Sequence, residues 1–280
     1  MRLLKIKKPE QRLGAALGAA LALLLIPGCA SADAVKLDGH PTQGGLMIGH
    51  APPGAVITLD GKPIRATPAG DFVFGFGRDQ PAKAALVVTA DGKTETHSID
   101  VAVRSWEIQS VTGLPPETVT PPPALLDRIK RENEILKAAR ARDSDDEDFL
   151  KPFVWPADGP ISGVYGSQRV LNGEPRQPHM GLDIAAPEGA PVRAAAAGRV
   201  SLAEHDLFYT GGTVMIDHGH GLSTIYVHMS AVEVKTGAVV TQGEEIGKVG
   251  KTGRAAGAHL HFGVGWFSER LDPALVLPAR

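Results

Sequence analysis

Cysteine and aromatic residues are scarce in this sequence, and neither sign of charge dominates it. Cys29 is the single cysteine among 280 residues, so no disulfide can form within the chain. Aromatic residues make up 5% of the sequence, against 33 glycines and 22 prolines, and this balance favours short strands and tight turns over long helices. The formal net charge is −2, which argues against the broad basic surface of a nucleic-acid-binding protein. No nucleic-acid partner is therefore expected.

Residues 1–29 have the pattern of an export signal. Basic residues precede an apolar run over residues 13–26, which is too short for a permanent membrane span and suits a signal peptide. Cys29 follows and resembles the lipidated cysteine of a bacterial lipobox, although Pro27 stands where a small residue is usual. The alternative is ordinary cleavage after Ala32. Because a lone thiol in an oxidising compartment is a liability, we favour a lipid anchor at Cys29 and a location in the periplasm or cell envelope.

Residues 30–107 are predicted to form a small all-β domain. Two apolar strands each end at an Asp-Gly pair, at residues 60–61 and 91–92, and Asp-Gly favours the two-residue turn of a hairpin. Residues 71–76 alternate with period two, which places three aromatic side chains on one face: Phe72, Phe74 and Phe76. We expect a small β-sandwich that binds or positions, without a catalytic cluster of its own.

Residues 108–150 are predicted to be a connector. Its first part is rich in proline and therefore stiff and extended. Residues 124–142 contain neither glycine nor proline and carry apolar residues at helical spacing, and Arg140 near the end suits the negative pole of a helix. The acidic run at residues 143–148 is expected to be a solvated, flexible joint rather than a metal site.

Residues 151–280 have the character of a second β domain. Short apolar segments alternate with glycine-marked turns, and four of them are predicted strands: residues 192–200, 212–217, 222–228 and 245–249. No helix of convincing length is predicted here. The expected fold class is thus mainly β, with an N-terminal sandwich, a helical Pro-rich connector and a C-terminal antiparallel sheet.

Histidines concentrate in this second β domain. His179 and Asp183 are four residues apart, whereas His259 and His261 are two apart and would project from one face of a strand. Two histidines and one aspartate around Zn²⁺ leave the fourth tetrahedral position for water, which is the open geometry of a hydrolytic site. Zinc lowers the pKa of such a water towards about 7. A further histidine could then act as the base.

Other histidines show that such spacing alone is weak. His218 and His220 repeat the two-residue spacing, but the glycines around them predict a turn between strands. His228 ends an apolar strand, and the residues around it favour an ordinary structural histidine. Each short pattern therefore remains ambiguous when it is taken by itself.

Three segments taken together resemble one known family. PHMGLDIAAP (residues 178–187), YVHMS (226–230) and GAHLHFG (257–263) are similar, in order and spacing, to the motifs of the lysostaphin/LytM-type zinc peptidases. The resemblance spans residues 155–273. It implies an antiparallel sheet with an open groove and a metal on its floor. The loop at residues 166–173 is expected to form one groove wall.

The resemblance also implies a role for each matching residue. His179, Asp183 and His261 would be the zinc ligands, and His259 the general base that takes a proton from the metal-activated water. His228 would stabilise the tetrahedral intermediate or orient the water. His218 and His220 would lie outside the metal sphere.

The favoured function is an exported zinc endopeptidase that hydrolyses the peptide cross-links of peptidoglycan. The alternative is a catalytically latent LytM-type regulator that activates a partner, such as a cell-wall amidase or a divisome component. All five expected positions carry the required residue type, which favours the hydrolase. A metal-storage or sensing module is a third interpretation, but it would not need His228 and His259 beside a complete ligand set.

Overall fold

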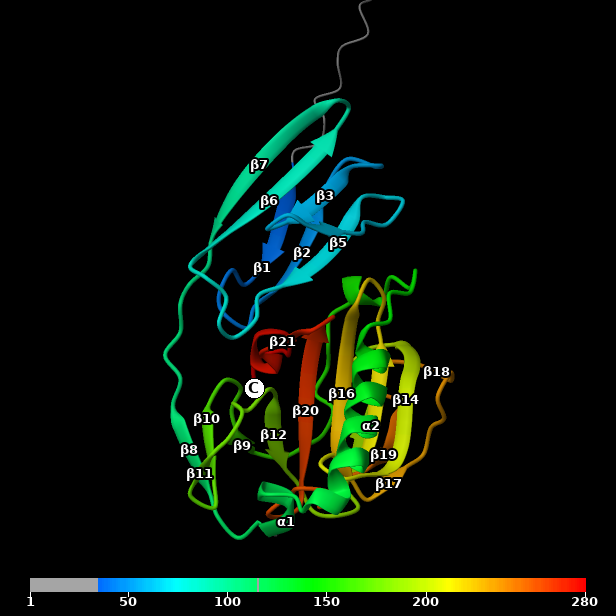
Figure 1. Ribbon diagram of the computed structural model, residues 1–280. Helices are drawn as coiled ribbons and strands as arrows, with labels where there is room; N and C mark the ends of the chain where they lie inside the picture. Colours follow the sequence, from blue (N-terminus) through cyan, green and yellow to red (C-terminus); the bar gives the residue numbers. More distant parts are fainter. Residues whose placement is uncertain (1–34, 115) are drawn as a thin grey trace, which may run out of the picture. The chain divides into compact units, whose positions relative to one another are not determined.

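A computed structural model describes residues 35–114 and 116–280 of the chain (Figure 1). The expected signal peptide and the lipobox at Cys29 lie outside these residues. Strands dominate, as predicted, and most of them pair antiparallel. Within the described part of the chain, no helix is both long and apolar enough to cross a membrane.

The N-terminal β region consists of two sheets around one apolar core, which confirms the predicted sandwich. One sheet has the order β1-β2-β5 and the other the order β4-β3-β6-β7. Asp60 and Asp91 both have positive φ in the turns of their hairpins, as expected for Asp-Gly pairs. The strands are β1 (Lys36–Gly39), β2 (Leu46–His50), β3 (Val56–Leu59), β4 (Lys62–Ile64), β5 (Asp71–Gly75), β6 (Lys83–Ala90) and β7 (Lys93–Asp100).

Strand β5 is buried on both of its faces. Phe72, Phe74 and Phe76 lie together in the core of the sandwich, as their alternation predicts. Val73 points the other way and belongs to the core that fills the C-terminal sheet. Gly75 lies so close to the side chain of Leu271 that a Cβ atom there would come within 2.5 Å of it. The sandwich is therefore packed against the C-terminal region rather than tethered to it.

The connector contains the predicted helix, α2 (Pro123–Arg140), and a short helix before it, α1 (Pro116–Val119). Leu136 and Ala139 of α2 pack against apolar side chains of the C-terminal sheet, among them Met215. The acidic run differs from the expected free joint, because the guanidinium group of Arg65 binds the carboxylates of Asp143 and Asp145. These contacts fix the connector against both β regions.

Strand β8 (Ile108–Val111) is a connector element that the proline-rich sequence did not predict. It pairs in parallel with β10 (Gln168–Leu171), and β10 pairs with β11 (Glu174–Pro175) on its other side. The strand exists because β10 offers a free edge, which local sequence cannot reveal. The predicted groove wall at residues 166–173 is thus part of a three-stranded sheet completed by the connector.

The C-terminal region is built on one large antiparallel sheet and a small second sheet, β13-β19-β17. The large sheet has the order β18-β14-β15-β16-β20-β12-β9, with β21 beside β20. Its strands are β9 (Ile161–Gly163), β12 (Leu182–Ala185), β14 (Gly198–Leu207), β15 (Gly211–Asp217), β16 (Leu222–Met229), β18 (Val239–Val240), β20 (His259–Trp266) and β21 (Glu269–Leu271). Those of the small sheet are β13 (Pro191–Arg193), β17 (Ala231–Val232) and β19 (Glu245–Lys248).

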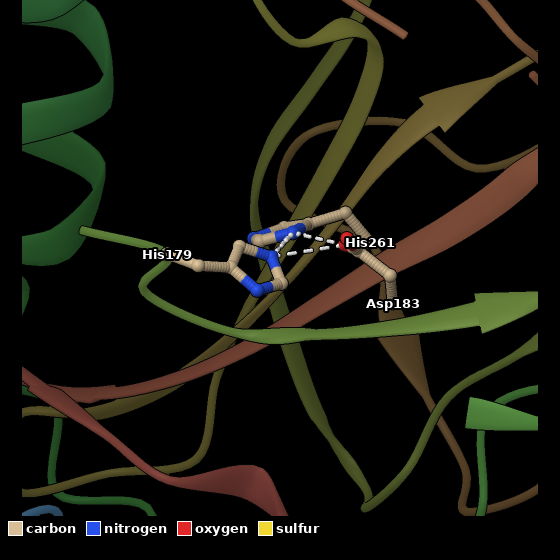
Figure 2. Close-up of side chains that lie close together, drawn as sticks. All are labelled: His179, Asp183 and His261. Atoms are coloured by element: carbon tan, nitrogen blue, oxygen red, sulfur yellow. Dashed lines mark hydrogen bonds and ion pairs between the residues drawn. The ribbon is translucent and has the colours of Figure 1, made fainter. Parts of the chain in front are cut away.

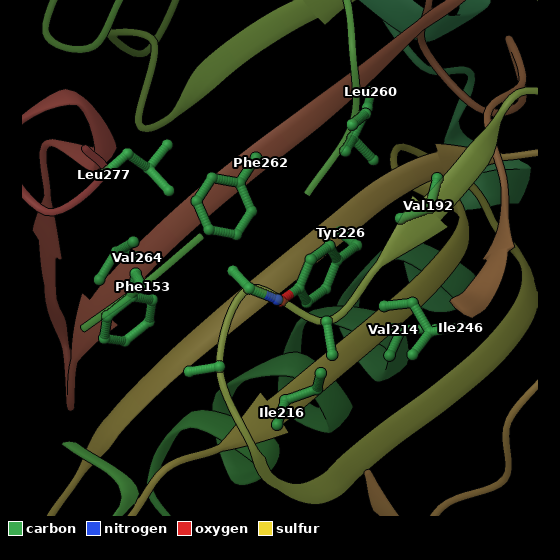
Figure 3. Close-up of a cluster of buried hydrophobic side chains, with 14 of the residues drawn as sticks. Phe153, Val192, Val214, Ile216, Tyr226, Ile246, Leu260, Phe262, Val264 and Leu277 are labelled. Carbon is green, nitrogen blue, oxygen red and sulfur yellow. The ribbon is translucent and has the colours of Figure 1, made fainter. Parts of the chain in front are cut away.

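One face of the large sheet carries the apolar core of this region (Figure 3). Ile216, Tyr226 and Phe262 come from three adjacent strands and are fully buried there. The buried hydroxyl of Tyr226 accepts a hydrogen bond of 2.8 Å from the backbone amide of Ala195, and burial raises the pKa of Tyr226 to about 12. Since successive residues of a strand face opposite sides, the alternate positions of the same strands are left for the other face.

Candidate metal centre and groove

Strand pairing brings the candidate ligands together on the face opposite the core. Asp183 of β12 lies directly across from His261 of β20 in the antiparallel register. The neighbours Ile184 and Leu260 belong to the apolar core, so Asp183 and His261 point away from it. His259 is two residues before His261 on β20 and shares its face, as its spacing predicts.

His179 joins Asp183 and His261 from the chain that leads into β12, and the three side chains point toward one another (Figure 2). The Nδ1 atom of His261 lies 2.8 Å from the Oδ1 atom of Asp183 and 2.8 Å from the Nε2 atom of His179. His179 Nε2 lies 3.0 Å from the same oxygen. Each residue thus offers one donor atom to a common point.

A backbone carbonyl fixes which nitrogen His179 presents. His179 Nδ1 lies 2.9 Å from the carbonyl oxygen of Val164, and because a carbonyl only accepts, this nitrogen carries the hydrogen. Its Nε2 atom therefore keeps a lone pair directed at Asp183 and His261. Such an outer hydrogen bond sets the tautomer of a metal-binding histidine. The arrangement prepares His179 as a ligand through Nε2.

The triangle of donor atoms passes a simple test for a metal. Three atoms about 3 Å apart can form one face of a tetrahedron around an ion that lies about 2 Å from each of them, and the set of two imidazoles and one carboxylate suits Zn²⁺. Two glycines leave room for it: a Cβ atom on Gly163 would come within 2.4 Å of Asp183 Oδ2, and one on Gly181 within 2.6 Å of His261 Nε2.

The charge states of the triad also suit a cation. Burial alone would raise the pKa of Asp183, but its close contacts with His179 and His261 hold that pKa well below its ordinary value. For His261, burial lowers the pKa to about 4 against the opposing effect of Asp183. At neutral pH the site therefore holds a carboxylate and a neutral imidazole, which are the forms that bind metals.

His228 reaches the groove through a bulge at the end of β16. Between two paired positions, Val227 and His228 face the single residue Thr213 of β15, so β16 has one extra residue here. His228 adopts φ of 65°, in the left-handed region that non-glycine residues seldom occupy. Regular alternation would send His228 to the core side with Tyr226, and the bulge turns it to the groove side instead. A re-aimed, strained residue of this kind is typical of functional sites.

His228 and His259 lie beside each other at the edge of the triad. Their ring centres are 4.8 Å apart, and His259 Nε2 lies 3.8 Å from Asp183 Oδ1. The Nδ1 atoms of the two rings donate to the carbonyl oxygens of Thr252 and Gly257, at 2.8 and 2.9 Å. Both rings therefore direct an unprotonated Nε2 into the groove. Burial, and then the charges of His259 and His261, lower the pKa of His228 to about 3, so it is neutral at ordinary pH.

The other histidine pair lies away from this cluster. His218 is buried, with Nδ1 on the carbonyl oxygen of Ala197 and Nε2 on the hydroxyl of Thr224, and burial lowers its pKa. His220 has positive φ in a turn and contacts the ring of Phe149. The expected turn is present, and the hydrogen bonds of His218 give it a structural role.

Two pockets that share a wall make up the groove. The connector-side pocket is lined by Asp183 and His259, and by Gln109, Val111 and Leu114 of the connector. The arginine-lined pocket contains His179, His228 and His261. Arg169 and Arg254 line both.

Sequence patterns did not predict that arginines line the groove. Arg169 donates from Nη2 to Asp183 Oδ2 at 2.7 Å, and Arg140, Arg254 and Arg270 line the arginine-lined pocket. No spacing signal could have found this set, because its members come from α2, β10, a loop and β21.

Comparison with known proteins agrees with this geometry. Residues 177–273 match the family model described as peptidase family M23. A solved structure of a peptidase M23 from Pseudomonas aeruginosa is 32% identical to this chain, with a TM-score of 0.66. The match covers 84% of this chain and 94% of the other, so it includes the regions before the matched family domain.

Curated relatives match over shorter stretches. The cell division protein DipM of Caulobacter vibrioides is 32% identical over 172 residues, which cover 57% of this chain and 26% of DipM. The peptidoglycan DD-endopeptidase ShyA of Vibrio cholerae is 42% identical over 85 residues, which cover 30% of this chain and 20% of ShyA. The matches therefore span 26% and 20% of the lengths of these two relatives.

Proposed function

Since the chain belongs to the lysostaphin/LytM-type peptidases of family M23, we propose that it is a zinc-dependent endopeptidase that hydrolyses the peptide cross-links of peptidoglycan. The observation that carries the proposal is the convergence of His179 Nε2, Asp183 Oδ1 and His261 Nδ1 within 4.8 Å of one another on the floor of a groove. The similarity to a peptidoglycan DD-endopeptidase supports the substrate class.

His179, Asp183 and His261 would hold the metal. When bound, a zinc ion supplies a Lewis acid that activates water and polarises the scissile carbonyl. The chain contributes a donor set in the right charge states, and Arg169 and Val164 hold two of the donors in orientation from outside.

His259 is proposed as the general base. Its Nδ1 hydrogen is committed to the carbonyl oxygen of Gly257, which leaves Nε2 free to accept a proton near Asp183. The ring is partly exposed in the groove, so a proton taken from the attacking water can pass to the leaving amine or to solvent. An acceptor within reach of the metal triad is the element that a storage site would lack.

His228 is proposed to orient the attacking water rather than to stabilise an oxyanion by charge. With Nδ1 donating to Thr252 and a pKa of about 3, its Nε2 atom is an acceptor and not a donor at neutral pH. An acceptor can fix a water molecule through one of its hydrogens. Of the two roles that the family resemblance allows for His228, this tautomer favours orienting the water over stabilising the tetrahedral intermediate.

An exported location, with or without a lipid anchor at Cys29, is part of the proposal because the substrate lies outside the cytoplasm. Digestion of purified sacculi by the full chain, with and without a chelator, tests the function. We expect chelator-sensitive loss of cross-linked dimers in the chromatogram of released fragments. If zinc-loaded protein cleaves no sacculi, the endopeptidase proposal is wrong, and the alternative of a latent regulator that activates a partner amidase is favoured.

A further inference from the structure

One threonine holds the bulge of β16 at three points. Thr252 lies in the loop between β19 and β20. Its backbone carbonyl oxygen accepts the Nδ1 hydrogen of His228 at 2.8 Å. Its hydroxyl accepts a hydrogen bond of 2.9 Å from the backbone amide of Gly212 and donates one of 2.9 Å to the carbonyl oxygen of Met229. Thr252 therefore contacts β15, the ring of His228, and the residue that follows His228 in the chain.

The two backbone groups that the hydroxyl joins belong to paired residues. Gly212 and Met229 face each other across β15 and β16, and the extra residue of the bulge lies directly beside this pair. A hydroxyl group can accept one hydrogen bond while it donates another, so it serves an amide and a carbonyl where the ladder is interrupted. The side chain of a valine, which has a similar shape, could do neither.

The loop that carries Thr252 packs closely on the turn between β14 and β15. Gly211 has φ of 61°, and a Cβ atom there would come within 2.0 Å of the hydroxyl oxygen of Thr252. Gly253 has φ of 67°, and a Cβ atom there would come within 2.5 Å of the backbone nitrogen of Gly211. The backbone amide of Arg254 donates to the carbonyl oxygen of Tyr209 at 2.9 Å. Two glycines and a backbone hydrogen bond thus define where Thr252 lies.

His228 requires such support because its backbone is strained. A non-glycine residue with positive φ persists only where its surroundings fix it firmly. The amide of His228 donates to the carbonyl oxygen of Thr210 at 2.8 Å, which holds the backbone but leaves the ring free to rotate. The contact between Nδ1 and the carbonyl oxygen of Thr252 sets the rotation of the ring. This second contact decides which nitrogen faces the groove.

We propose that Thr252 is the positioning residue of His228: its hydroxyl locks the bulge of β16 and thereby holds the carbonyl that keeps His228 Nε2 directed into the groove. The inference rests on the proposed function for the part that His228 plays in turnover. It adds a residue outside the metal triad on which that part depends.

The tautomer of the His228 ring provides a test that needs no turnover. The full chain is prepared with ¹⁵N-labelled histidine, and ring-nitrogen NMR spectra are recorded at neutral pH before and after zinc is added. The signal is assigned by its loss in His228→Asn. We expect the wild type to show one form, with the hydrogen on Nδ1. Thr252→Val should show a mixture of tautomers, whereas Thr252→Ser, which keeps the hydroxyl, should show the wild-type form.

Turnover of a soluble cross-linked peptidoglycan fragment provides the kinetic test. Thr252→Val should lower kcat by about 10- to 100-fold, because a misplaced ring orients the water poorly. KM and the zinc content should stay at wild-type values, since neither depends on that orientation. Thr252→Ser should restore most of the turnover.

Thr236→Val is the matched control for loss of a threonine hydroxyl. The hydroxyl of Thr236 also accepts from a strand amide, that of Ala203 at 3.0 Å, but this strand is β14, which is separated from β16 by β15. Thr236→Val should leave the His228 tautomer and kcat unchanged.

The outcomes separate this inference from the proposed function. A wild-type ring with its hydrogen on Nε2 overturns the inference and needs no variant to fold. A wild-type tautomer or an unchanged kcat in Thr252→Val also overturns it. A loss that Thr252→Ser fails to reverse, or that Thr236→Val shares, overturns it as well, because the hydroxyl then has no specific role. If the wild type digests nothing, the proposed function fails, while the NMR comparison still decides whether Thr252 positions the ring.

Discussion

Arg169 Nη2 donates to Asp183 Oδ2 at 2.7 Å, while Asp183 Oδ1 faces His179 and His261 at 3.0 and 2.8 Å. The arginine thus occupies one carboxylate oxygen and leaves the other for a metal. Arg169 comes from β10, whose far edge is paired with β8 of the connector. A connector strand therefore supports the strand that orients a candidate ligand.

Arg169→Lys is expected to lower zinc affinity by about tenfold, which is at the lower end for loss of an outer-shell partner. Lysine keeps the positive charge, so the change isolates the planar geometry that fixes the carboxylate. Competition with a chromophoric chelator measures the affinity. Unchanged affinity would mean that Asp183 is oriented by its histidine neighbours alone.

Removal of a triad member should abolish zinc binding, whereas removal of the base should not. We expect His261→Ala and Asp183→Ala to lose stoichiometric zinc in metal analysis. His259→Ala should retain zinc and lose about 10²- to 10⁴-fold in turnover, as is usual for a general base. His205→Ala, at an exposed position on β14, is the control and should keep both. Stoichiometric zinc in the first two variants would contradict the ligand assignment.

Gly181→Ala should impair the metal site by crowding rather than by backbone strain. A Cβ atom there would come within 2.6 Å of both His261 Nε2 and the carbonyl oxygen of Phe262, and the backbone oxygen cannot move aside easily. We expect zinc affinity to fall by an order of magnitude or more. Gly257→Ala is the matched control within the third motif, because nothing lies within 4 Å of its added Cβ. Similar affinities for the two variants would argue against this account.

The metal-free protein should lose stability on acidification. His228 and His261 have folded-state pKa values of about 3 and about 4, below their ordinary value of 6.5, so the unfolded chain binds more protons as pH falls through 6.5. The stability of the fold is therefore highest above pH 6.5. Each histidine should remove about 2 kcal/mol between pH 7 and pH 5. Asp183, whose pKa is also depressed, acts in the same direction at lower pH.

Urea unfolding at pH 7 and pH 5 measures this loss, and His228→Asn provides its control. Asparagine tolerates the positive φ of this position, does not titrate here, and can donate to Thr252 in place of Nδ1. The variant should lose about half of the pH dependence. A full pH dependence in His228→Asn would assign the effect to other groups.

Where the strands are regular, sequence periodicity was sufficient to predict which face of the sheet a side chain lies on. The predicted shared face of His259 and His261 follows from strand period, and β12 pairs Asp183 with His261 as an ordinary antiparallel neighbour. His228 could be assigned only by family resemblance, because its bulge reverses the side that alternation would give it. At His228, strand alternation therefore predicts the core side, whereas the side chain lies on the groove side.

Features that depend on contacts between residues far apart in the chain could not be predicted from sequence patterns. Arg140 was explained as a favourable charge at the end of a helix, and its place in the groove depends on how α2 packs on the sheet. The strand at residues 108–111 forms only because β10 offers an edge to it. The acidic run is held by Arg65, whose partners are about 80 residues away in the chain.

The parallel pairing of β8 with β10 has a consequence for how this protein can be rearranged. Gln109 and Val111 of β8 line the same pocket as Asp183 and His259, so chain from before residue 115 supplies part of the recognition surface. A gene fusion that joins residues 151–280 to a foreign protein would carry the candidate metal ligands without the connector residues that form one wall of the groove. Exchange between relatives should preserve function only when the crossover lies upstream of residue 108.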